Sequence, residues 1–188
     1  KNWKFKAVTV DYGIGQDFSY LIEHFKNHCI DYEIIKTNSF EVMQEKAKQN
    51  TTICSFCARL RRGHLYTYAL KNGFNKVALG HHLDDAVESF FMNFTYNGAL
   101  RTLAPKYTAK NGLVLIRPLI FARERQIRDC AIRNELKVVG DECCPAYSME
   151  NKMPHARANT KELLLNLEKN NPKLFISLKA AFENIHKD

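Results

Sequence analysis

The stretch KVALGHHLDD, residues 76–85, decides the fold. Its first five residues form a short apolar run that predicts a buried strand, and Asp84 opens a helix that we expect to reach Tyr96. The strand ends at Gly80, and two histidines follow before the helix; packing explains these polar residues poorly. In α/β proteins with parallel sheets, ligands bind beyond the carboxyl ends of the strands. This turn is therefore the first place at which we expect a functional site.

The alternation of strand and helix extends outward from this stretch to about residue 140. Apolar and β-branched runs predict further strands over residues 5–11, 32–36, 113–119 and 137–140. Apolar residues at helical spacing predict helices over residues 17–29, 39–48, 54–72, 84–96 and 122–135, with two more that start at Thr160 and Pro172. Such alternation predicts an α/β fold with a parallel sheet flanked by helices. We expect one domain over residues 1–188, in which a cysteine loop at 141–158 and C-terminal helices at 159–188 follow the sheet and its helices at about 1–140.

Length and composition suit a soluble domain with a substantial core, since 45% of the 188 residues are hydrophobic. No apolar run approaches the roughly 20 residues that span a bilayer, and no segment has the order of a signal peptide. We therefore expect a cytoplasmic protein, and one longer than this chain, because Lys1 lies only a few residues before the first strand. The net charge of +8 favours a polyanionic partner, although a generally basic, solvated surface explains it equally well.

Cysteines form the second candidate site. Cys54 and Cys57 make a Cys-x-x-Cys pair at the start of a helix that also carries several arginines, and both features favour the thiolate that binds metal or attacks sulfur. Cys143 or Cys144, about 87 residues later, could supply a third thiolate. A structural zinc site and a redox-active dithiol remain open as alternatives. For the other two cysteines we expect buried, structural thiols: Cys29 and Cys130.

Carboxylates and basic residues complete the set of candidates. Asp84 and Asp85, at a helix N-terminus, could hold Mg²⁺ together with phosphates, or could simply cap the helix. Arg117 lies at the end of the strand predicted over 113–119 and could place a guanidinium over a phosphate. Other basic residues are candidates for contact with RNA, with a solvated basic surface as the ordinary alternative: Arg59, Arg61, Arg62, Arg123, Arg125, Arg128, Arg133, Lys137, Lys152 and Arg157.

Three segments in a fixed order resemble the PP-loop ATPase family, and most closely its tRNA 2-thiocytidine synthetase subgroup. They are CSFCARLRRG (54–63), KVALGHHLDDAVESFFMN (76–93) and LIRPL (115–119), followed by a late Cys-Pro. The resemblance implies a Rossmann-like sheet of the adenine nucleotide α-hydrolase type. It also implies an enzyme that uses ATP to adenylate a cytidine in the tRNA anticodon loop and inserts sulfur, by way of an iron–sulfur cluster, to give 2-thiocytidine.

The resemblance also implies roles for individual residues. Cys54, Cys57 and Cys144 match the ligands of a [4Fe–4S] cluster, with Cys143 as the less favoured third ligand. Asp85 matches a position that assists the chemistry, and Arg61 stands where a related 2-thiouridine branch has a catalytic lysine. Four residues would lie near the nucleotide: Gly80, His81, Asp84 and Arg117. The implied cofactors are ATP, Mg²⁺ and the cluster, and the implied partners are tRNA, a sulfur donor such as a cysteine desulfurase, and a second copy of the chain.

This chain departs from the family's pattern in one feature. The family's phosphate-binding loop, Ser-Gly-Gly-x-Asp-Ser, does not occur here, and we expect it in residues that precede Lys1. The alternative is a degenerate protein without ATPase activity. Two other functions also remain open, namely another PP-loop enzyme on tRNA (a 2-thiouridine or lysidine synthetase) and a non-catalytic, zinc-stapled RNA-binding module.

Overall fold

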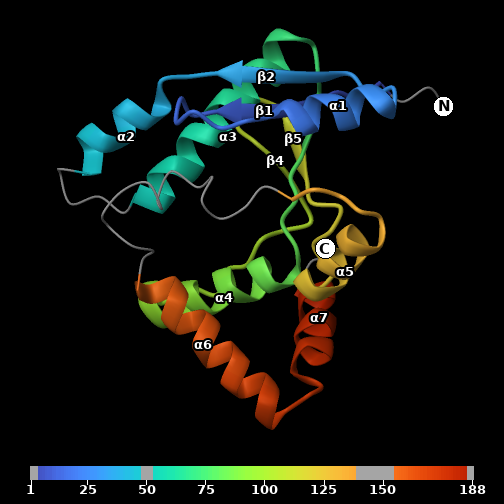
Figure 1. Ribbon diagram of the computed structural model, residues 1–188. Helices are drawn as coiled ribbons and strands as arrows, with labels where there is room; N and C mark the ends of the chain where they lie inside the picture. The colour runs from blue at the N-terminus through green and yellow to red at the C-terminus, as the bar shows by residue number, and fades with distance from the viewer. Residues whose placement is uncertain (1–3, 48–52, 139–154, 186–188) are drawn as a thin grey trace. The chain divides into compact units, whose positions relative to one another are not determined.

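The computed structural model describes residues 4–47, 53–138 and 155–185, and these divide between two compact units (Figure 1). The first unit comprises residues 1–72 and 137–153, and the second comprises residues 73–136 and 154–188. Each unit has its own sheet and its own apolar core. Within the described parts of the chain, no helix is both long and apolar enough to cross a bilayer.

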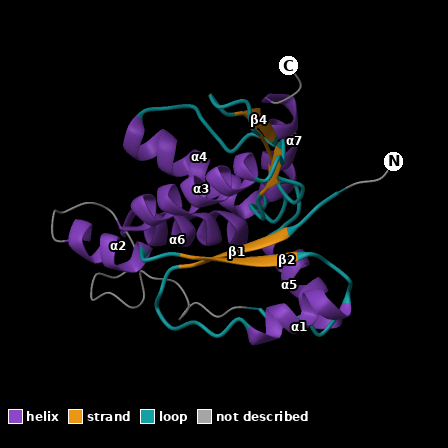
Figure 2. Ribbon diagram, turned by 90° about the horizontal axis from the view of Figure 1, so that it is seen from above, coloured by secondary structure: helices purple, strands orange, loops and turns teal. Residues whose placement is uncertain are grey.

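The first unit is built on two parallel strands, β1 (Ala7–Asp11) and β2 (Tyr32–Lys36), paired from Ala7 opposite Tyr32 to Asp11 opposite Lys36. Helix α1 (Ser19–Asn27) connects them and packs on β2, whereas α3 (Ile53–Lys71) packs on β1 and on α2 (Ser39–Ala47). Figures 1 and 2 show α1 and α3 on opposite faces of the strand pair. The parallel pair with helices on both sides is the arrangement that the sequence pattern predicted.

The core of the first unit lies between the strands and α3. Val10, Tyr12 and Met43 are its buried members, and Met43 is fully buried. Partly buried side chains pack around them, including three from the N-terminal half of α3: Phe56, Cys57 and Leu60. The apolar side of α3 thus holds the helix against the sheet, and Cys57 is part of that side.

The second unit contains a three-stranded sheet in the order β3-β5-β4. Strands β3 (Lys76–Ala78) and β5 (Val114–Ile116) run parallel, while β4 (Lys106–Thr108) is antiparallel to β5. The described residues of this unit also form four helices: α4 (Leu83–Asn97), α5 (Glu124–Arg133), α6 (His155–Asn170) and α7 (Leu174–Ile185). Helix α4 packs along α6, and α6 contacts α7.

Leu83, Ala86 and Val87 at the start of α4 are the centre of the second unit's core. Residues from later in the chain close over them: Ile120, Leu164, Phe175 and Phe182. Burial of each large apolar side chain contributes roughly 1.5–3 kcal/mol to folding. The first turn of α4 is therefore held firmly, and this same turn begins directly after the two histidines of the GHHLDD motif.

The predicted order of elements is confirmed, and three details differ. Strand β4 was not predicted, because its three residues, Lys-Tyr-Thr, expose both ends and carry no apolar run. Helix α6 begins at His155, five residues before the expected start. Lys137 and Val138 lie in irregular backbone, and the other residues of the strand expected at 137–140 fall outside the described residues.

The expectation that Cys29 and Cys130 are buried is wrong, since both are exposed. Cys29 follows the end of α1 in a left-handed conformation, with φ of 52°, so its side chain does not continue the apolar stripe of that helix. Cys130 lies on the solvent side of α5. In both cases a position near apolar residues in the sequence was not a position on the apolar face.

Candidate functional site

The GHHLDD turn joins the end of β3 to the start of α4. Leu79 N–H donates to the Ile116 carbonyl (2.9 Å), so the backbone still runs beside β5 just before the turn. Gly80 is exposed, and a Cβ there would meet no atom within 4 Å. His82 is the N-cap residue of α4, and it forms a reciprocal pair with Asp85. Asp85 Oδ2 accepts from His82 N–H (3.1 Å), and His82 Nδ1 accepts from Asp85 N–H (3.4 Å). Two backbone donors that a helix N-terminus leaves unpaired are satisfied in this way.

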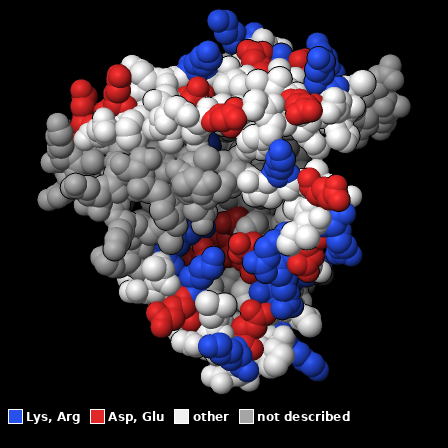
Figure 3. All heavy atoms as spheres, in the orientation of Figure 1, with Lys and Arg blue, Asp and Glu red and all other residues white. Residues whose placement is uncertain are grey.

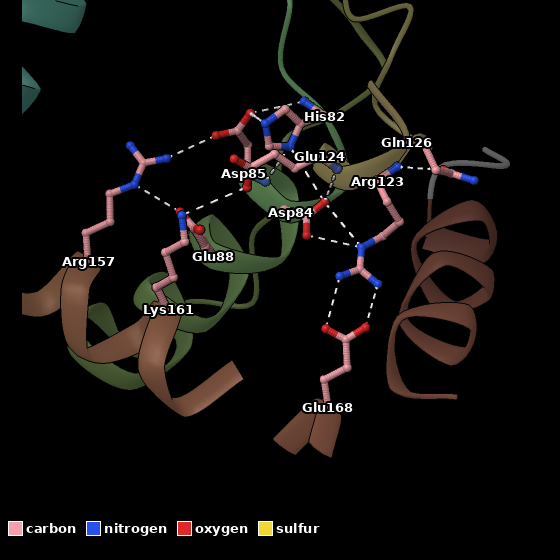
Figure 4. Close-up of polar contacts among 10 residues, drawn as sticks. All are labelled: His82, Asp84, Asp85, Glu88, Arg123, Glu124, Gln126, Arg157, Lys161 and Glu168. Atoms are coloured by element: carbon pink, nitrogen blue, oxygen red, sulfur yellow. Dashed lines mark hydrogen bonds and ion pairs between the residues drawn. The ribbon is translucent and has the colours of Figure 1, made fainter. Parts of the chain in front are cut away.

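Asp84 is bound by the N-terminus of α5 (Figure 4). Its Oδ2 accepts from Glu124 N–H (2.7 Å), and its Oδ1 accepts from Arg123 Nε (3.1 Å). The same guanidinium reaches Glu168 of α6 through two parallel bonds of 2.8 and 3.1 Å, and it lies 3.3 Å from the centre of the Phe175 ring. Arg123 therefore ties α4, α5, α6 and α7 together at one point.

Burial and ion pairing act in opposite directions on the pKa values of Arg123 and Glu168. Burial by itself lowers the pKa of Arg123, but the hydrogen bond that Arg123 donates to Glu168 and the charge of Asp84 raise that pKa by more. In return, the hydrogen bond from Arg123 lowers the pKa of Glu168. Arg123 and Glu168 are thus both ionised at neutral pH, although only 13% of the Arg123 side chain is exposed.

Asp85 belongs to a second ion-pair group, centred on Arg157 of α6. Arg157 donates from one terminal nitrogen to Asp85 Oδ1 (3.0 Å) and from Nε to Glu88 Oε2 (2.9 Å). Glu88 is only 6% exposed and, like Leu83, Ala86 and Val87, is one of the buried residues of α4. Burial alone lowers the pKa of Arg157, and the charges of Glu88 and Asp85 raise it by more. Both carboxylates of the GHHLDD motif are therefore held by arginines that come from later in the chain (Figure 4).

This arrangement bears on a magnesium site at Asp84 and Asp85. Mg²⁺ prefers carboxylate oxygens that can turn toward the ion, together with waters and phosphates. Here both oxygens of each carboxylate already accept hydrogen bonds from the protein. An ion at this position would have to compete with Arg123 and Arg157, so these two residues do not make a preformed Mg²⁺ site.

Arg117 follows β5, next to β3, which leads into the GHHLDD turn. It is 7% exposed; its guanidinium donates to the Ala104 carbonyl and lies 5.5 Å from the centre of the Tyr107 ring. The second unit thus brings Arg117 and the residues Gly80 to Asp85 to the carboxyl ends of two neighbouring parallel strands. That is where ligands bind in sheets of this kind.

A cavity of about 270 Å³ opens beside the ion-pair cluster, entirely within the second unit. Asp84, Arg123 and Glu168 form one part of its lining, and Leu164 and Phe175 form an apolar part. The remaining lining residues are mostly charged: Glu88, Glu124, Arg125, Arg128, Lys161 and Leu165.

The other candidate residues lie on or beyond α3 in the first unit. Cys54 and Cys57 occupy the first five residues of α3, three positions apart, which places both near the helix N-terminus, where thiolate is favoured. Cys57 is half-buried against the apolar core, and Arg61 is exposed. The side chain of Cys54 and the whole of Cys144 lie outside the described residues. Among the described residues, no group of three or more metal-ligating side chains occurs.

Helix α3 is also fixed by a polar contact. Ser39, the first residue of α2, is buried, and its Oγ lies 2.9 Å from Nε2 of His64. Thr37, just after β2, hydrogen-bonds to both Ser39 and the Asp11 carbonyl at the end of β1. The helix that carries the cysteine pair is thereby connected to the carboxyl ends of both strands in its unit.

The sequence did not identify the partners of the two aspartates. The sequence pattern indicates RNA contact for Arg123 and Arg157 and no role for Glu88 or Glu168, whereas the structure pairs these arginines with carboxylates. One signal is available, because Glu88 and the apolar Phe91 lie three positions apart and are neighbours on the helix, and a carboxylate that packing buries requires a cation. The sequence could not show which cation that is.

Comparisons with known proteins bear on this chain as a whole. The model of the PP-loop domain family matches residues 1–150. A tRNA-cytidine(32) 2-sulfurtransferase from Citrifermentans bemidjiense is 38% identical over 182 residues, which is 96% of this chain and 70% of that protein. The corresponding proteins from Geobacter metallireducens and Coxiella burnetii are 40% and 38% identical, over 95% and 91% of this chain and 69% and 65% of theirs.

The fold is also similar to a solved structure, the U34-tRNA thiolase NcsA from Methanococcus maripaludis with its [4Fe-4S] cluster. The TM-score is 0.74 at 21% sequence identity, over 96% of this chain and 61% of that one. At this level of identity the similarity supports the fold.

Proposed function

The chain belongs to the PP-loop family, in the group of the tRNA-cytidine(32) 2-sulfurtransferases, and from this premise we propose that it is an ATP-dependent enzyme that thiolates a cytidine in tRNA. The observation that carries the proposal is the 38–40% identity to curated members of that group over nearly the whole chain. The matched region includes the Cys-x-x-Cys pair and the GHHLDD turn.

The chemistry explains why such an enzyme needs two kinds of site. The C2 carbonyl of cytidine is a poor electrophile, and its oxygen is a poor leaving group. Attack of this oxygen on the α-phosphorus of ATP forms an O-adenylate and releases pyrophosphate. A sulfur nucleophile then attacks C2, the C2–O bond breaks, and AMP leaves with the oxygen. One site must therefore hold the nucleotide, and the other must supply reduced sulfur.

Thiolates of this chain are suited to the sulfur site. We infer that Cys54, Cys57 and Cys144 hold a [4Fe–4S] cluster, with Cys143 as the alternative third ligand. Two thiols one helical turn apart, near a helix N-terminus, match two corners of such a cluster. The cluster, when bound through only three thiolates, supplies an iron open to exogenous sulfur. Arg61, exposed on the same helix, is proposed as a cation that assists catalysis.

The second unit is suited to the nucleotide. We infer that Gly80, His81 and Arg117 lie beside it, at the carboxyl ends of β3 and β5. Asp84 shapes this region by fixing the first turn of α5, through its bond to Glu124 N–H. Asp85 is proposed as the residue that assists the chemistry, with its carboxylate oriented by His82 N–H and by Arg157.

We also propose a cellular compartment, a sulfur donor and an oligomeric state for the enzyme. Reduced thiols that bind a cluster suit the cytoplasm, where disulfides are rare. The sulfur would come from a donor such as a cysteine desulfurase, and the enzyme would act as a homodimer. The net charge of +8 suits tRNA as the polyanionic substrate.

The test uses the full-length protein purified without oxygen, together with Cys144→Ser, Cys143→Ser and, as a matched control, the exposed Cys130→Ser. We expect iron and acid-labile sulfide in the unaltered protein, in Cys143→Ser and in Cys130→Ser, and their loss in Cys144→Ser. Nucleoside analysis of tRNA from cells that carry each variant should show 2-thiocytidine lost only with Cys144→Ser. Equal loss in both Cys143→Ser and Cys144→Ser would overturn the ligand assignment. Stoichiometric zinc in a colourless protein, with normal 2-thiocytidine in cells that lack it, would overturn the function.

A further inference from the structure

The basic residues of the second unit fall into two groups: some are paired with carboxylates inside the protein, and others extend into solvent. Arg123 and Arg157 are engaged in ion pairs with buried or half-buried carboxylates of α4 and α6. Their guanidinium groups are needed inside the protein, so they are poor candidates for contact with a polyanion. Three other cations line the cavity beside this cluster and extend into solvent: Arg125, Arg128 and Lys161.

These three cations, which we call the rim cations, have weak partners or none. Arg125 is 62% exposed and lies 3.7 Å from Glu168, whose oxygens already accept two shorter bonds from Arg123. Lys161 is 55% exposed and lies 3.9 Å from Glu124. Arg128 makes no ion pair with any residue in the part of the chain that the structure describes. Exposed pairs at such distances contribute little, so the rim cations can exchange these partners for phosphate at small cost.

The rim cations come from two helices and line one cavity. Arg125 and Arg128 are three positions apart on α5, so their side chains are neighbours on one helix face. Lys161 joins them from α6, across the cavity that all three line. In the part of Figure 3 occupied by α4 to α7, basic side chains flank acidic side chains that lie deeper. Arg123 and Arg157 are bonded to the carboxylates beneath, so the cations that extend into solvent at the rim are Arg125, Arg128 and Lys161, beside the exposed carboxylate of Glu124.

We propose that the rim cations Arg125, Arg128 and Lys161 form a docking surface for the sugar–phosphate backbone of the tRNA substrate. This inference rests on the proposed function, because it names the face of this chain that the tRNA contacts. Contacts to phosphate fix the position and orientation of a nucleic acid without reading its sequence. The ion pairs of Arg123 beneath the rim cations fix the start of α5 against α6. The backbones that carry the three cations are therefore already positioned before tRNA binds.

The test compares two triple variants of the full-length protein. One neutralises the rim cations, as Arg125→Gln, Arg128→Gln and Lys161→Gln. The control neutralises three exposed lysines of the same unit that do not line the cavity, as Lys106→Gln, Lys110→Gln and Lys169→Gln. Both variants lower the net charge by three, so a difference between them reports position and not total charge. The affinity for labelled tRNA is measured by fluorescence anisotropy over a series of salt concentrations.

We expect the rim variant to bind tRNA at least about tenfold more weakly than the unaltered protein. The slope of its log affinity against log salt should also become shallower by about 2 to 3, because each lost phosphate contact reduces that slope by about 0.7 to 0.9. The control should keep the slope of the unaltered protein. The single variant Arg128→Gln, at an exposed position without a described partner, should lose a slope of about one, and it keeps the test decisive if the triple variant misfolds.

An unchanged slope in the rim variants, or an equal loss in rim and control variants, overturns the docking surface and leaves the proposed function intact. Failure of the unaltered protein to bind tRNA at all overturns the proposed function instead. The two failures are thus distinguished by the behaviour of the unaltered protein in the same assay.

Discussion

At the scale of single residues, Glu88 and Arg157 illustrate how the motif is built. Glu88 is buried on α4, and a buried carboxylate is costly unless a cation pairs with it. Arg157 supplies that cation and also binds Asp85. One guanidinium therefore stabilises the fold and orients the carboxylate that we propose for the chemistry.

We predict that Arg157→Ala lowers the free energy of unfolding by about 1–3 kcal/mol, because it leaves Glu88 buried without its counter-charge. The arginine is nearly half exposed, which keeps the loss below that of a fully buried pair. Urea denaturation measures the change. Adding Glu88→Gln to Arg157→Ala should recover part of the loss, because a neutral amide costs less to bury than an unpaired carboxylate. Additive losses in the double variant would show that the two residues do not interact.

At the scale of secondary-structure elements, the ends of α4 explain its length. The His82–Asp85 pair caps its start, and Gly98 ends it in a left-handed conformation, with φ of 59°. Such a conformation is the usual termination of a helix, and glycine adopts it without the strain that a Cβ brings. Gly63, by contrast, lies inside α3, where glycine is the weaker helix former.

We predict opposite effects for two glycine-to-alanine substitutions. Gly98→Ala should lower the free energy of unfolding by about 1 kcal/mol, since its backbone conformation disfavours a Cβ although the surrounding space is open. Gly63→Ala should raise it by about 0.5–1 kcal/mol, since a Cβ there meets nothing within 4 Å. Urea denaturation of the two variants side by side gives the comparison. Effects of the same sign would mean that local conformation does not decide stability at these positions.

At the scale of the whole molecule, the described residues form two compact units, each with its own core, while one family model spans residues 1–150 across both. Whether residues 1–188 form a single domain, as the sequence predicts, therefore depends on whether the two units unfold together. A single domain unfolds in one transition, whereas independent units unfold in two.

We predict that Met43→Ala in the first unit and Leu115→Ala in the second both lower the midpoint of one common transition. Both side chains are fully buried, so each substitution removes roughly 2–5 kcal/mol by leaving a cavity. Differential scanning calorimetry of the full-length protein distinguishes the cases. Two transitions, each sensitive to only one of the substitutions, would divide the chain into two domains.

Much of the fold could be predicted because its signals are local. The strands at 32–36 and 76–80 and the helix at 84–96 were apparent from apolar periodicity and from polar residues at helix starts. Strand β4 was not, because a three-residue strand in an antiparallel pair depends on its neighbour β5 and not on its own sequence. The cysteine pair was likewise local, and its position at the start of α3 agrees with the prediction.

The sequence by itself determined the order of helices and strands, the polar turn between β3 and α4, and the position of the thiol pair on its helix. Each of these depends on residues a few positions apart. Only the tertiary structure decided what the charged residues do: Asp84 and Arg123 are 39 positions apart, and Asp85 and Arg157 are 72 apart. These pairs form because α4 packs along α6 and its first turn meets the start of α5. The charge of an arginine is set by its chemistry, but whether it faces a carboxylate or the solvent is set by packing that local patterns do not encode.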